Sequence, residues 1–192
     1  MKKLSTLFKK DPNNLGRVIN EIDPQNQWVL DGEGLATRKF DGTAVAIFGG
    51  KMWKRYDVKH GKPVPFGAVP CQEPDEITGH WPHWVEVYQD SPADKYIVEA
   101  FTMGFKNHLD EKNNGTYEAY GEKINGNKEK VEGHWLVKHG SVLVRLTHSE
   151  VNFEGIKAFL SNPDNDIEGI VFHHKTDGRM CKIRKSDFGI KR

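Results

Sequence analysis

One short segment brings together residue types that can do chemistry. Lys39 and Asp41 stand two residues apart, and Gly42 follows them shortly before the apolar run 44–48. A lysine amine attacks an electrophile only after losing its proton, and a free lysine with a pKa of ~10.4 is almost wholly protonated at neutral pH. On a strand, Lys39 and Asp41 would share one face, and Gly42 would let the backbone turn tightly or approach a ligand. Taken alone, the segment favours an exposed Lys–Asp pair at a turn over a nucleophile.

A second segment supplies the cations that a reactive lysine needs. Lys182 and Arg184 are separated by one residue in "CKIRK", so they share one face of a predicted strand. Nearby cations and burial lower the pKa of a lysine, and cations also neutralise the oxygens of a phosphate. The pair therefore suits a lysine that attacks a nucleotide phosphate.

Two glutamates lie at the ends of predicted strands. Glu118 is near the end of "TYEAYGE", and Glu168 begins the apolar strand "EGIVF". Each one by itself is more typical of a solvated carboxylate than of a ligand. Two carboxylates that converge with several cations fit a Mg²⁺-nucleotide, because the metal needs oxygen ligands and the phosphates need positive charge.

The four segments in order resemble a known superfamily. "KFDG", "YEAYG", "IEGIVF" and "CKIRK" look like motifs I, III, IV and V of the covalent nucleotidyltransferases, which comprise ATP-dependent DNA ligases, RNA ligases and mRNA capping enzymes. The longer phrases "WVLDGEGLATRKFDGTA", "GTYEAYGEKINGN" and "KIRKSDFG" are most similar to a small 5′-3′ RNA ligase family with viral and eukaryotic members. The resemblance begins around Leu4 and reaches Arg184, so it covers most of the chain.

The resemblance implies a fold and a reaction. The expected fold is a single ligase-type nucleotidyltransferase domain (ATP-grasp-like) over residues 1–192, with antiparallel sheets around an ATP cleft and no OB-fold domain. Lys39 would attack the α-phosphate of ATP, release pyrophosphate and hold AMP. The AMP would pass to an RNA 5′-phosphate, and an RNA 3′-hydroxyl would then displace it. The implied cofactors are ATP and Mg²⁺, with Mn²⁺ as a possible substitute.

The resemblance also assigns roles to single residues. Lys39 is the expected catalytic nucleophile, Glu118 binds the ribose or helps to place a metal, and Glu168 binds the metal through water. Lys182 and Arg184 hold the α-phosphate. The full set expected to bind ATP is Lys39, Asp41, Gly42, Arg55, Glu118, Trp135, Glu168, Lys182 and Arg184, and the expected metal ligands are Glu118 and Glu168.

Several of these assignments keep an alternative. Motif V usually reads Lys-x-Lys, but here its second position is Arg184 with Lys185 beside it, so either one could contact the phosphate. Arg55 matches an arginine that contacts the ribose or the RNA 5′-phosphate, yet it could equally be an exposed hairpin arginine. Trp135 is the candidate for stacking on the base, yet it could equally be a core tryptophan.

Composition limits the class of protein. The chain has 192 residues, of which 36% are hydrophobic and 29% charged, with a formal net charge of +1. These values indicate one globular domain without a general basic coat for nucleic acid, although lysines and arginines gather in residues 178–192. No run is long enough to span a membrane, and the N-terminus lacks the apolar stretch of a secretory signal. Cys71 and Cys181 suggest two reduced thiols.

The hydrophobic pattern predicts an α+β protein built on antiparallel sheets. The predicted strands are 35–40, 43–48, 51–58, 116–122, 134–139, 142–146, 167–174 and 179–185. Gly49–Gly50 marks a hairpin, and turns are expected at Asp41–Gly42 and Asp177–Gly178. The proline-rich stretch 61–74 should be irregular.

Two segments carry helical patterns. Residues 149–163 have apolar side chains at helical spacing, and Thr147 with Glu150 has the spacing of a capping box at the start of this helix. Residues 94–105 fit a helix, with Ile97 and Phe101 on one face, but part of this segment also fits a strand.

The sequence therefore predicts an ATP-dependent RNA ligase. Its expected partner is RNA with 5′-phosphate and 3′-hydroxyl ends, and it should be a monomer of the cytoplasm, or of the host cytoplasm if viral, without membrane contact. The alternatives are a DNA ligase, an mRNA-capping guanylyltransferase, or a non-catalytic module that binds nucleotide or RNA. Zinc bound by Cys71, His80 and His83 is a minor alternative because no fourth ligand lies nearby.

Overall fold

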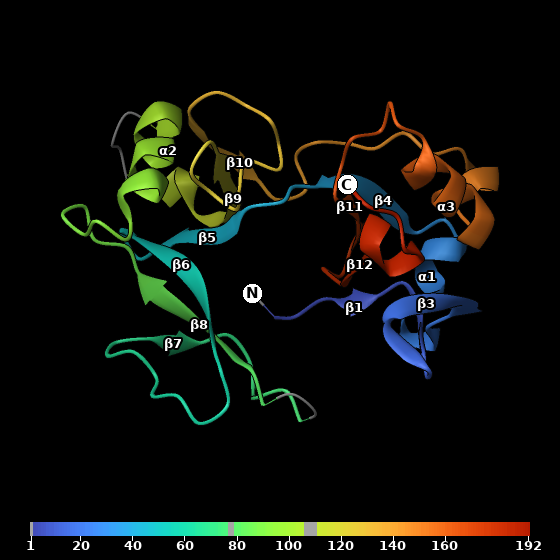
Figure 1. Ribbon diagram of the computed structural model, residues 1–192, viewed down its shortest axis with the longest axis horizontal. Helices are drawn as coiled ribbons and strands as arrows, with labels where there is room; N and C mark the ends of the chain where they lie inside the picture. The colour runs from blue at the N-terminus through green and yellow to red at the C-terminus, as the bar shows by residue number, and fades with distance from the viewer. Residues whose placement is uncertain (1, 77–78, 106–110) are drawn as a thin grey trace. The chain divides into compact units, whose positions relative to one another are not determined.

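The computed structural model describes residues 2–76, 79–105 and 111–192. The chain forms two compact units, each assembled from separate segments. Unit 1 comprises Met1–Lys3 and Asp41–His139, and unit 2 comprises Leu4–Phe40 and Gly140–Arg192. Both units are mixed α+β with few helices, as the hydrophobic pattern predicts (Figure 1). The sheets are almost entirely antiparallel, as expected.

Unit 2 is built on a four-stranded sheet in the order β1-β12-β11-β4. Only β1 and β12 run parallel. The strands of this sheet are β1 (Ser5–Thr6), β4 (Gly34–Lys39), β11 (Gly169–His174) and β12 (Met180–Arg184). The other elements are the hairpin β2 (Phe8–Asp11) and β3 (Asn14–Ile22), the helices α1 (Gln27–Leu30) and α3 (Phe153–Ser161), and the 3₁₀ turns η1 (Pro24–Asn26), η3 (His148–Glu150) and η4 (Lys185–Phe188).

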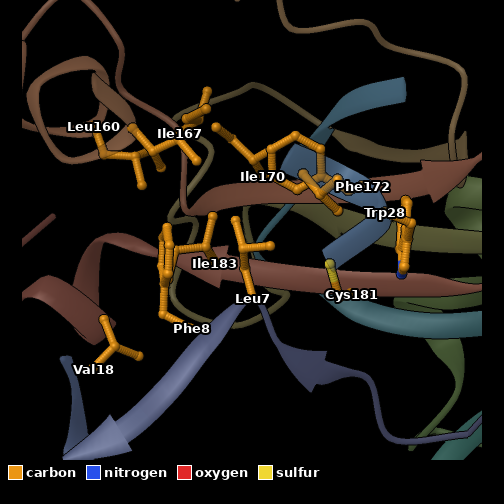
Figure 2. Close-up of a cluster of buried hydrophobic side chains, with 12 residues drawn as sticks. Leu7, Phe8, Val18, Trp28, Leu160, Ile167, Ile170, Phe172, Cys181 and Ile183 are labelled. Atoms are coloured by element: carbon orange, nitrogen blue, oxygen red, sulfur yellow. The ribbon is translucent and has the colours of Figure 1, made fainter. Parts of the chain in front are cut away.

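One face of this sheet forms the core of unit 2. Alternate residues of β11 and β12 point the same way, so Ile170, Phe172 and Ile183 are all buried on one side. Figure 2 shows these side chains among Leu7 of the N-terminal segment and Leu160 of α3. Since the core occupies this face, the intervening residues of the same strands must lie on the opposite face.

Unit 1 is built on a six-stranded sheet in the order β10-β9-β5-β6-β8-β7. Its strands are β5 (Thr43–Phe48), β6 (Lys51–Val58), β7 (Val69–Pro70), β8 (Trp81–Glu86), β9 (Gly115–Gly121) and β10 (His134–Lys138). The helix α2 (Lys95–Phe105) and the 3₁₀ turn η2 (Glu111–Asn113) complete the described elements. Ile97 and Phe101 of α2 pack with Val45 and Tyr117 of the sheet. Residues 94–105 therefore contain a helix, and the expected apolar face is the buried one.

Two predicted turns are confirmed. Gly49 and Gly50 join β5 to β6, with φ values of 59° and 67° that L side chains rarely adopt. Asp177–Gly178 lies between the antiparallel strands β11 and β12, and Gly178 has a φ of 77°. Glycine at these positions fits the local geometry that a tight turn requires.

Two local predictions need correction. Asp41–Gly42 connects β4 to β5, which belong to different sheets, and the chain passes here from unit 2 to unit 1. Strand β4 ends at Lys39, so the argument that Lys39 and Asp41 share a strand face does not apply. The segment 142–146 is not a strand, because it pairs with β4 only through an isolated bridge at Leu143, whose side chain is exposed.

The helix predicted at 149–163 begins later than expected. The capping box of Thr147 and Glu150 is present, but it caps η3. Helix α3 starts at Phe153 and has its own cap, Asn152, whose side chain accepts a hydrogen bond from the Gly155 N–H. The capping motif was thus identified correctly and assigned to the wrong helix.

Candidate functional site

Four charged residues of unit 2 lie on or beside the face of its sheet that is opposite the core. We call Lys39, Glu168, Lys182 and Arg184 the charged face. Lys39 and Arg184 both pair with Gly169 of the central strand β11, and Lys182 pairs with Val171, two residues further along. Paired residues point to the same side of a sheet, so the register places Lys39, Lys182 and Arg184 on one face. Glu168 directly precedes Gly169.

Lys39 and Glu168 form an ion pair across strands that are far apart in sequence. Both side chains are largely buried, with 23% and 19% of their surfaces exposed. The Lys39 amine also lies 3.4 Å from the carbonyl oxygen of Phe40. Glu168 is therefore not the solvated strand-start carboxylate that it would be in isolation. This ion pair must open before the Lys39 amine can attack an electrophile.

Lys182 lies in a position that disfavours its charged form. Burial, together with the nearby charges of Arg184 and Lys39, lowers the pKa of Lys182 from 10.5 to about 8. Asp187 and Glu168 oppose this shift. At neutral pH the amine still carries its proton and can neutralise a phosphate oxygen. A bound anion would offset the cost of holding three cations together.

Arg184 is held by a carboxylate that the sequence reasoning missed. Asp187 is fully buried and accepts hydrogen bonds from Arg184 Nη2 at 3.0 Å, from the Arg184 backbone N–H at 2.9 Å and from Lys10 Nζ at 2.7 Å. The hydrogen bond to Asp187 raises the pKa of Arg184. Burial alone would raise the pKa of Asp187, but the hydrogen bonds and charges of Arg184 and Lys10 lower it.

The spacing of Arg184 and Asp187 was a usable signal for this contact. Asp187 is the third residue of η4 and accepts a hydrogen bond from the backbone N–H of Arg184, the residue before η4, which is one half of a capping box. Nothing in the spacing signals Lys10, which lies 177 residues from Asp187. The contact of Lys10 follows only from the folding of unit 2.

Lys185 differs from Arg184 in its place in the fold. It begins η4 after β12 has ended, and it is only 6% exposed. Its backbone N–H donates to the carbonyl oxygen of Glu168 at 2.9 Å. Arg184 continues the alternation of Lys182 on β12, whereas Lys185 does not. The geometry of motif V therefore favours Arg184 as the second cation of the charged face.

A face of the unit 1 sheet carries three of the predicted site residues. Glu118 pairs with Val137, and two positions along the same strands Tyr120 pairs with Trp135, so Glu118 and Trp135 share a face. Through Ala44 and Ala46 of β5 this face continues to Trp53 and Arg55 of β6. Arg55 pairs in turn with Trp84 of β8. We call this side, with Ala46, Trp53, Arg55, Trp84, Glu118 and Trp135, the aromatic face; α2 packs on the other side.

Glu118 is held by two hydrogen bonds within unit 1. Its Oε1 accepts from the backbone N–H of Gly42 at 3.2 Å, and its Oε2 lies 2.9 Å from Nε2 of His139. The carboxyl side chain is 12% exposed. A β-carbon on Gly42 would lie 2.1 Å from the carbonyl oxygen of Ala119, so this position requires glycine. The close backbone approach expected of Gly42 is therefore made to the chain itself.

Asp41 is fixed by a loop that follows β9. Its backbone N–H donates to Oε1 of Glu129 at 2.8 Å, and its carboxylate accepts a hydrogen bond from the side chain of Asn125. Asn125, Asn127 and Lys130 of this loop have positive φ values of 47°, 50° and 54°. Non-glycine residues adopt this conformation at a cost of about 1 kcal/mol or more each, so the loop is held by its surroundings.

The structure argues against the non-functional alternatives for Arg55 and Trp135, which were an exposed hairpin arginine and a core tryptophan. Arg55 is only 19% exposed and forms an ion pair with Asp57 at 3.0 Å, so it is not a free surface arginine. Trp135 is 40% exposed, so it is not a core tryptophan, and its Nε1 donates to the carbonyl oxygen of Glu132 at 2.7 Å. Their proposed contacts with ribose, phosphate and base stay predictions.

Among the described residues, no three His, Cys, Asp or Glu side chains group closely enough to hold a metal ion. This includes the minor zinc alternative at Cys71, His80 and His83. His83 is buried, and its Nδ1 donates to the carbonyl oxygen of Trp81 at 2.9 Å. None of the helices in the described part of the chain is long and apolar enough to cross a membrane.

Comparison with models of known protein families gives no match, and comparison with curated protein sequences gives none either. The resemblance to the nucleotidyltransferases thus depends on the four motifs. The fold, the ATP cleft and the site roles that it implies stay predictions. The geometry of the charged face and of the aromatic face adds physical arguments to them.

Proposed function

We propose that the protein is an ATP-dependent RNA ligase that works through a covalent lysyl-AMP intermediate. The observation that carries the proposal is the charged face, where β4, β11 and β12 bring motif residues Lys39, Lys182 and Arg184 to one side of a sheet with Glu168 paired to Lys39. These residues are up to 145 positions apart in sequence, from 39 to 184. Three cations on one face repel one another, and a bound phosphate would offset this repulsion.

The charged face supports the first step chemically. The Lys39 amine loses a proton and forms a bond to the α-phosphorus of ATP, and the bond between the α-phosphorus and the bridging oxygen breaks so that pyrophosphate leaves. Lys182 and Arg184 stabilise the negative charge on the α-phosphate oxygens, and Asp187 keeps the Arg184 guanidinium oriented.

The later steps use the same phosphorus and then the RNA. An oxygen of the RNA 5′-phosphate attacks the α-phosphorus, and the bond to Lys39 breaks. The RNA 3′-hydroxyl then loses its proton and attacks the 5′-phosphorus, and AMP leaves. In each step, Arg184 and Lys182 would stabilise the negative charge that develops on the oxygens of the AMP phosphate.

Magnesium is part of the proposal through the chemistry of Glu168. Its carboxylate has the hard oxygen donors that Mg²⁺ and Mn²⁺ take, and Mg²⁺ commonly binds through one carboxylate, waters and substrate phosphates. When bound, the metal supplies positive charge to the phosphates of ATP. Glu118 is the second carboxylate that the resemblance assigns to ribose or metal.

The proposal is tested by covalent labelling. The protein is incubated with α-labelled ATP or GTP and Mg²⁺, denatured and examined for acid-labile label, and it is then offered RNA with 5′-phosphate and 3′-hydroxyl ends. We expect label from ATP, its loss in Lys39→Ala and Lys39→Arg, and sealing of the RNA. Lys51→Ala, which removes an exposed strand lysine of unit 1, is the matched control and should keep wild-type labelling.

The possible outcomes separate the alternatives. Label from GTP alone would indicate a capping-type guanylyltransferase, and sealing of DNA but not RNA would indicate a DNA ligase. Absence of label from either nucleotide, with ATP still bound, would indicate a non-catalytic module. Label that survives Lys39→Ala would place the nucleophile elsewhere.

A further inference from the structure

We propose that His139 is a positioning residue that orients Glu118 toward a ribose hydroxyl of ATP. The inference rests on the proposed function and adds a residue that none of the four motifs contains. His139 directly follows β10, and its Nε2 lies 2.9 Å from Oε2 of Glu118 on the neighbouring strand β9. Both residues belong to unit 1.

The two nitrogens of the His139 ring have different surroundings. A carboxylate can only accept a hydrogen bond, so Nε2 carries a hydrogen and donates it to Glu118. Nδ1 is buried and has no hydrogen-bond partner among the residues that the structure describes. The geometry therefore assigns a hydrogen to Nε2, which makes His139 a hydrogen-bond donor to Glu118.

Glu118 has a defined hydrogen-bonding capacity left for a ligand. Gly42 N–H occupies one site on Oε1, and His139 occupies one site on Oε2. Each carboxylate oxygen has a further lone pair, so Glu118 can accept one more hydrogen bond on either oxygen. A ligand that meets it must bring a donor, and the hydroxyls of a ribose are such donors.

His139 is itself held by the strand pair that carries Glu118. Its backbone N–H donates to the carbonyl oxygen of Thr116 at 3.0 Å, two residues before Glu118. The ring and the carboxylate are thus both tied to β9 and are largely buried, at 23% and 12% exposure. Loss of the imidazole would free the Glu118 carboxylate to rotate and would leave Oε2 without its donor.

The test compares side chains that place a donor differently. A glutamine amide nitrogen reaches about as far from the backbone as Nε2 of histidine, whereas an asparagine amide nitrogen corresponds to Nδ1. Initial rates of lysyl-AMP formation are measured with ATP, 2′-deoxy-ATP and 3′-deoxy-ATP for wild type, His139→Ala, His139→Gln and His139→Asn. His60→Ala, at an exposed turn of unit 1, is the control.

We expect His139→Ala to raise the KM for ATP about tenfold, which is typical for loss of a hydrogen bond to a charged group. The value of kcat should change less. One of the two deoxy analogues should react more slowly than ATP with wild type, and this difference in rate should become smaller in His139→Ala. His139→Gln should restore most of the preference, and His139→Asn should resemble His139→Ala. Thermal unfolding of each variant shows whether it is folded; if His139→Ala is not, the Gln and Asn variants decide.

The outcomes distinguish this inference from the proposed function. If wild-type protein forms no lysyl-AMP, the ligase proposal fails and His139 loses its role with it. If wild type reacts but all three His139 variants keep its preference for ATP, only the role of His139 is overturned. The same conclusion follows if Gln and Asn are equally poor, because a general structural requirement for histidine would produce that result.

Discussion

The charged face of unit 2 and the aromatic face of unit 1 have the same construction but different chemistry. In each unit one side of a sheet is buried in an apolar core, and the other side carries the predicted site residues. The charged face gathers Lys39, Lys182 and Arg184 around Glu168, whereas the aromatic face surrounds Arg55 and Glu118 with tryptophans. Under the proposed function, the charged face would take part in phosphate transfer and the aromatic face would recognise the nucleoside.

The difference teaches how each group is held. On the charged face, ionised side chains hold one another. Lys39 pairs with Glu168, and the buried Asp187 pairs with Arg184 and Lys10. On the aromatic face, a backbone group provides part of the support, because Glu118 accepts a hydrogen bond from the Gly42 N–H. We therefore expect substitutions that remove a charge to affect unit 2 more strongly than unit 1.

The largest effect is expected for Asp187→Asn on the charged face. This change leaves Arg184 and Lys10 without their buried carboxylate, and breaking a buried ion pair costs about 3 kcal/mol. The free energy of unfolding, measured by urea denaturation, should fall by that amount, and AMP binding should weaken as Arg184 loses its orientation.

Glu21→Gln is the matched control for Asp187→Asn. It removes an exposed partner of Lys9 on the same hairpin as Lys10, and it should leave the free energy of unfolding nearly unchanged because surface ion pairs contribute little. If both substitutions lowered the free energy of unfolding equally, the ion pairs of Asp187 would have no special role in holding the charged face.

A comparable effect is expected at one glycine in each unit. A β-carbon at Gly169 would lie 2.3 Å from the carbonyl oxygen of Ile183, and one at Gly42 would lie 2.1 Å from that of Ala119. Because the obstacle is backbone in both cases, Gly169→Ala and Gly42→Ala should each lower the free energy of unfolding by about 2 kcal/mol.

Gly104→Ala provides a control of opposite sign. Gly104 lies in α2 with open space around its β-position, so alanine there should stabilise the protein by about 0.5 kcal/mol. If Gly169→Ala or Gly42→Ala left the free energy of unfolding unchanged in the same series, the strands would be able to shift. Backbone packing would then not require glycine at that position.

A smaller and pH-dependent effect is expected for Lys182. Its pKa of about 8 lies below the ordinary value, so in the free protein the ammonium is lost as the pH rises through 8. AMP binding, followed by calorimetry from pH 7 to 10, should weaken above pH 8 by at most about tenfold per unit. Lys182→Arg stays charged throughout and should remove this decline, whereas Lys51→Arg on unit 1 should keep it.

The sign of the effect on stability is opposite to that on binding. Between pH 8 and 10.5 the unfolded chain binds more protons at Lys182 than the folded protein does, so this group makes the folded state more stable as the pH rises. A wild-type AMP affinity that stays flat to pH 10 would contradict the lowered pKa.

The smallest effect on stability is expected for Trp135 on the aromatic face. Its side chain is 40% exposed, so Trp135→Ala should change the free energy of unfolding by less than about 1 kcal/mol. If it stacks on adenine, the same change should weaken AMP binding about tenfold, and Trp135→Phe should retain most of the affinity. Unchanged affinity would contradict the stacking role of Trp135.

Prediction from sequence succeeded where local chemistry decides the structure. The β-type runs 43–48 and 51–58 with Gly49–Gly50 between them were sufficient to predict the β5–β6 hairpin. It failed where a partner decides: the apolar pattern of 142–146 resembles a strand, but only an isolated bridge forms beside β4. Likewise, a capping box cannot say which of two successive helices it caps.

The candidate site divides in the same way. The sequence by itself identified Lys39, Glu168, Lys182 and Arg184, because residue types and alternation show which side chains carry charge and which share a face. It could not predict that Glu168 pairs with Lys39, that Asp187 joins Arg184 to Lys10, or that His139 meets Glu118. Those contacts depend on strand register between segments far apart in the chain, and only burial of the two cores in the tertiary structure selects that register.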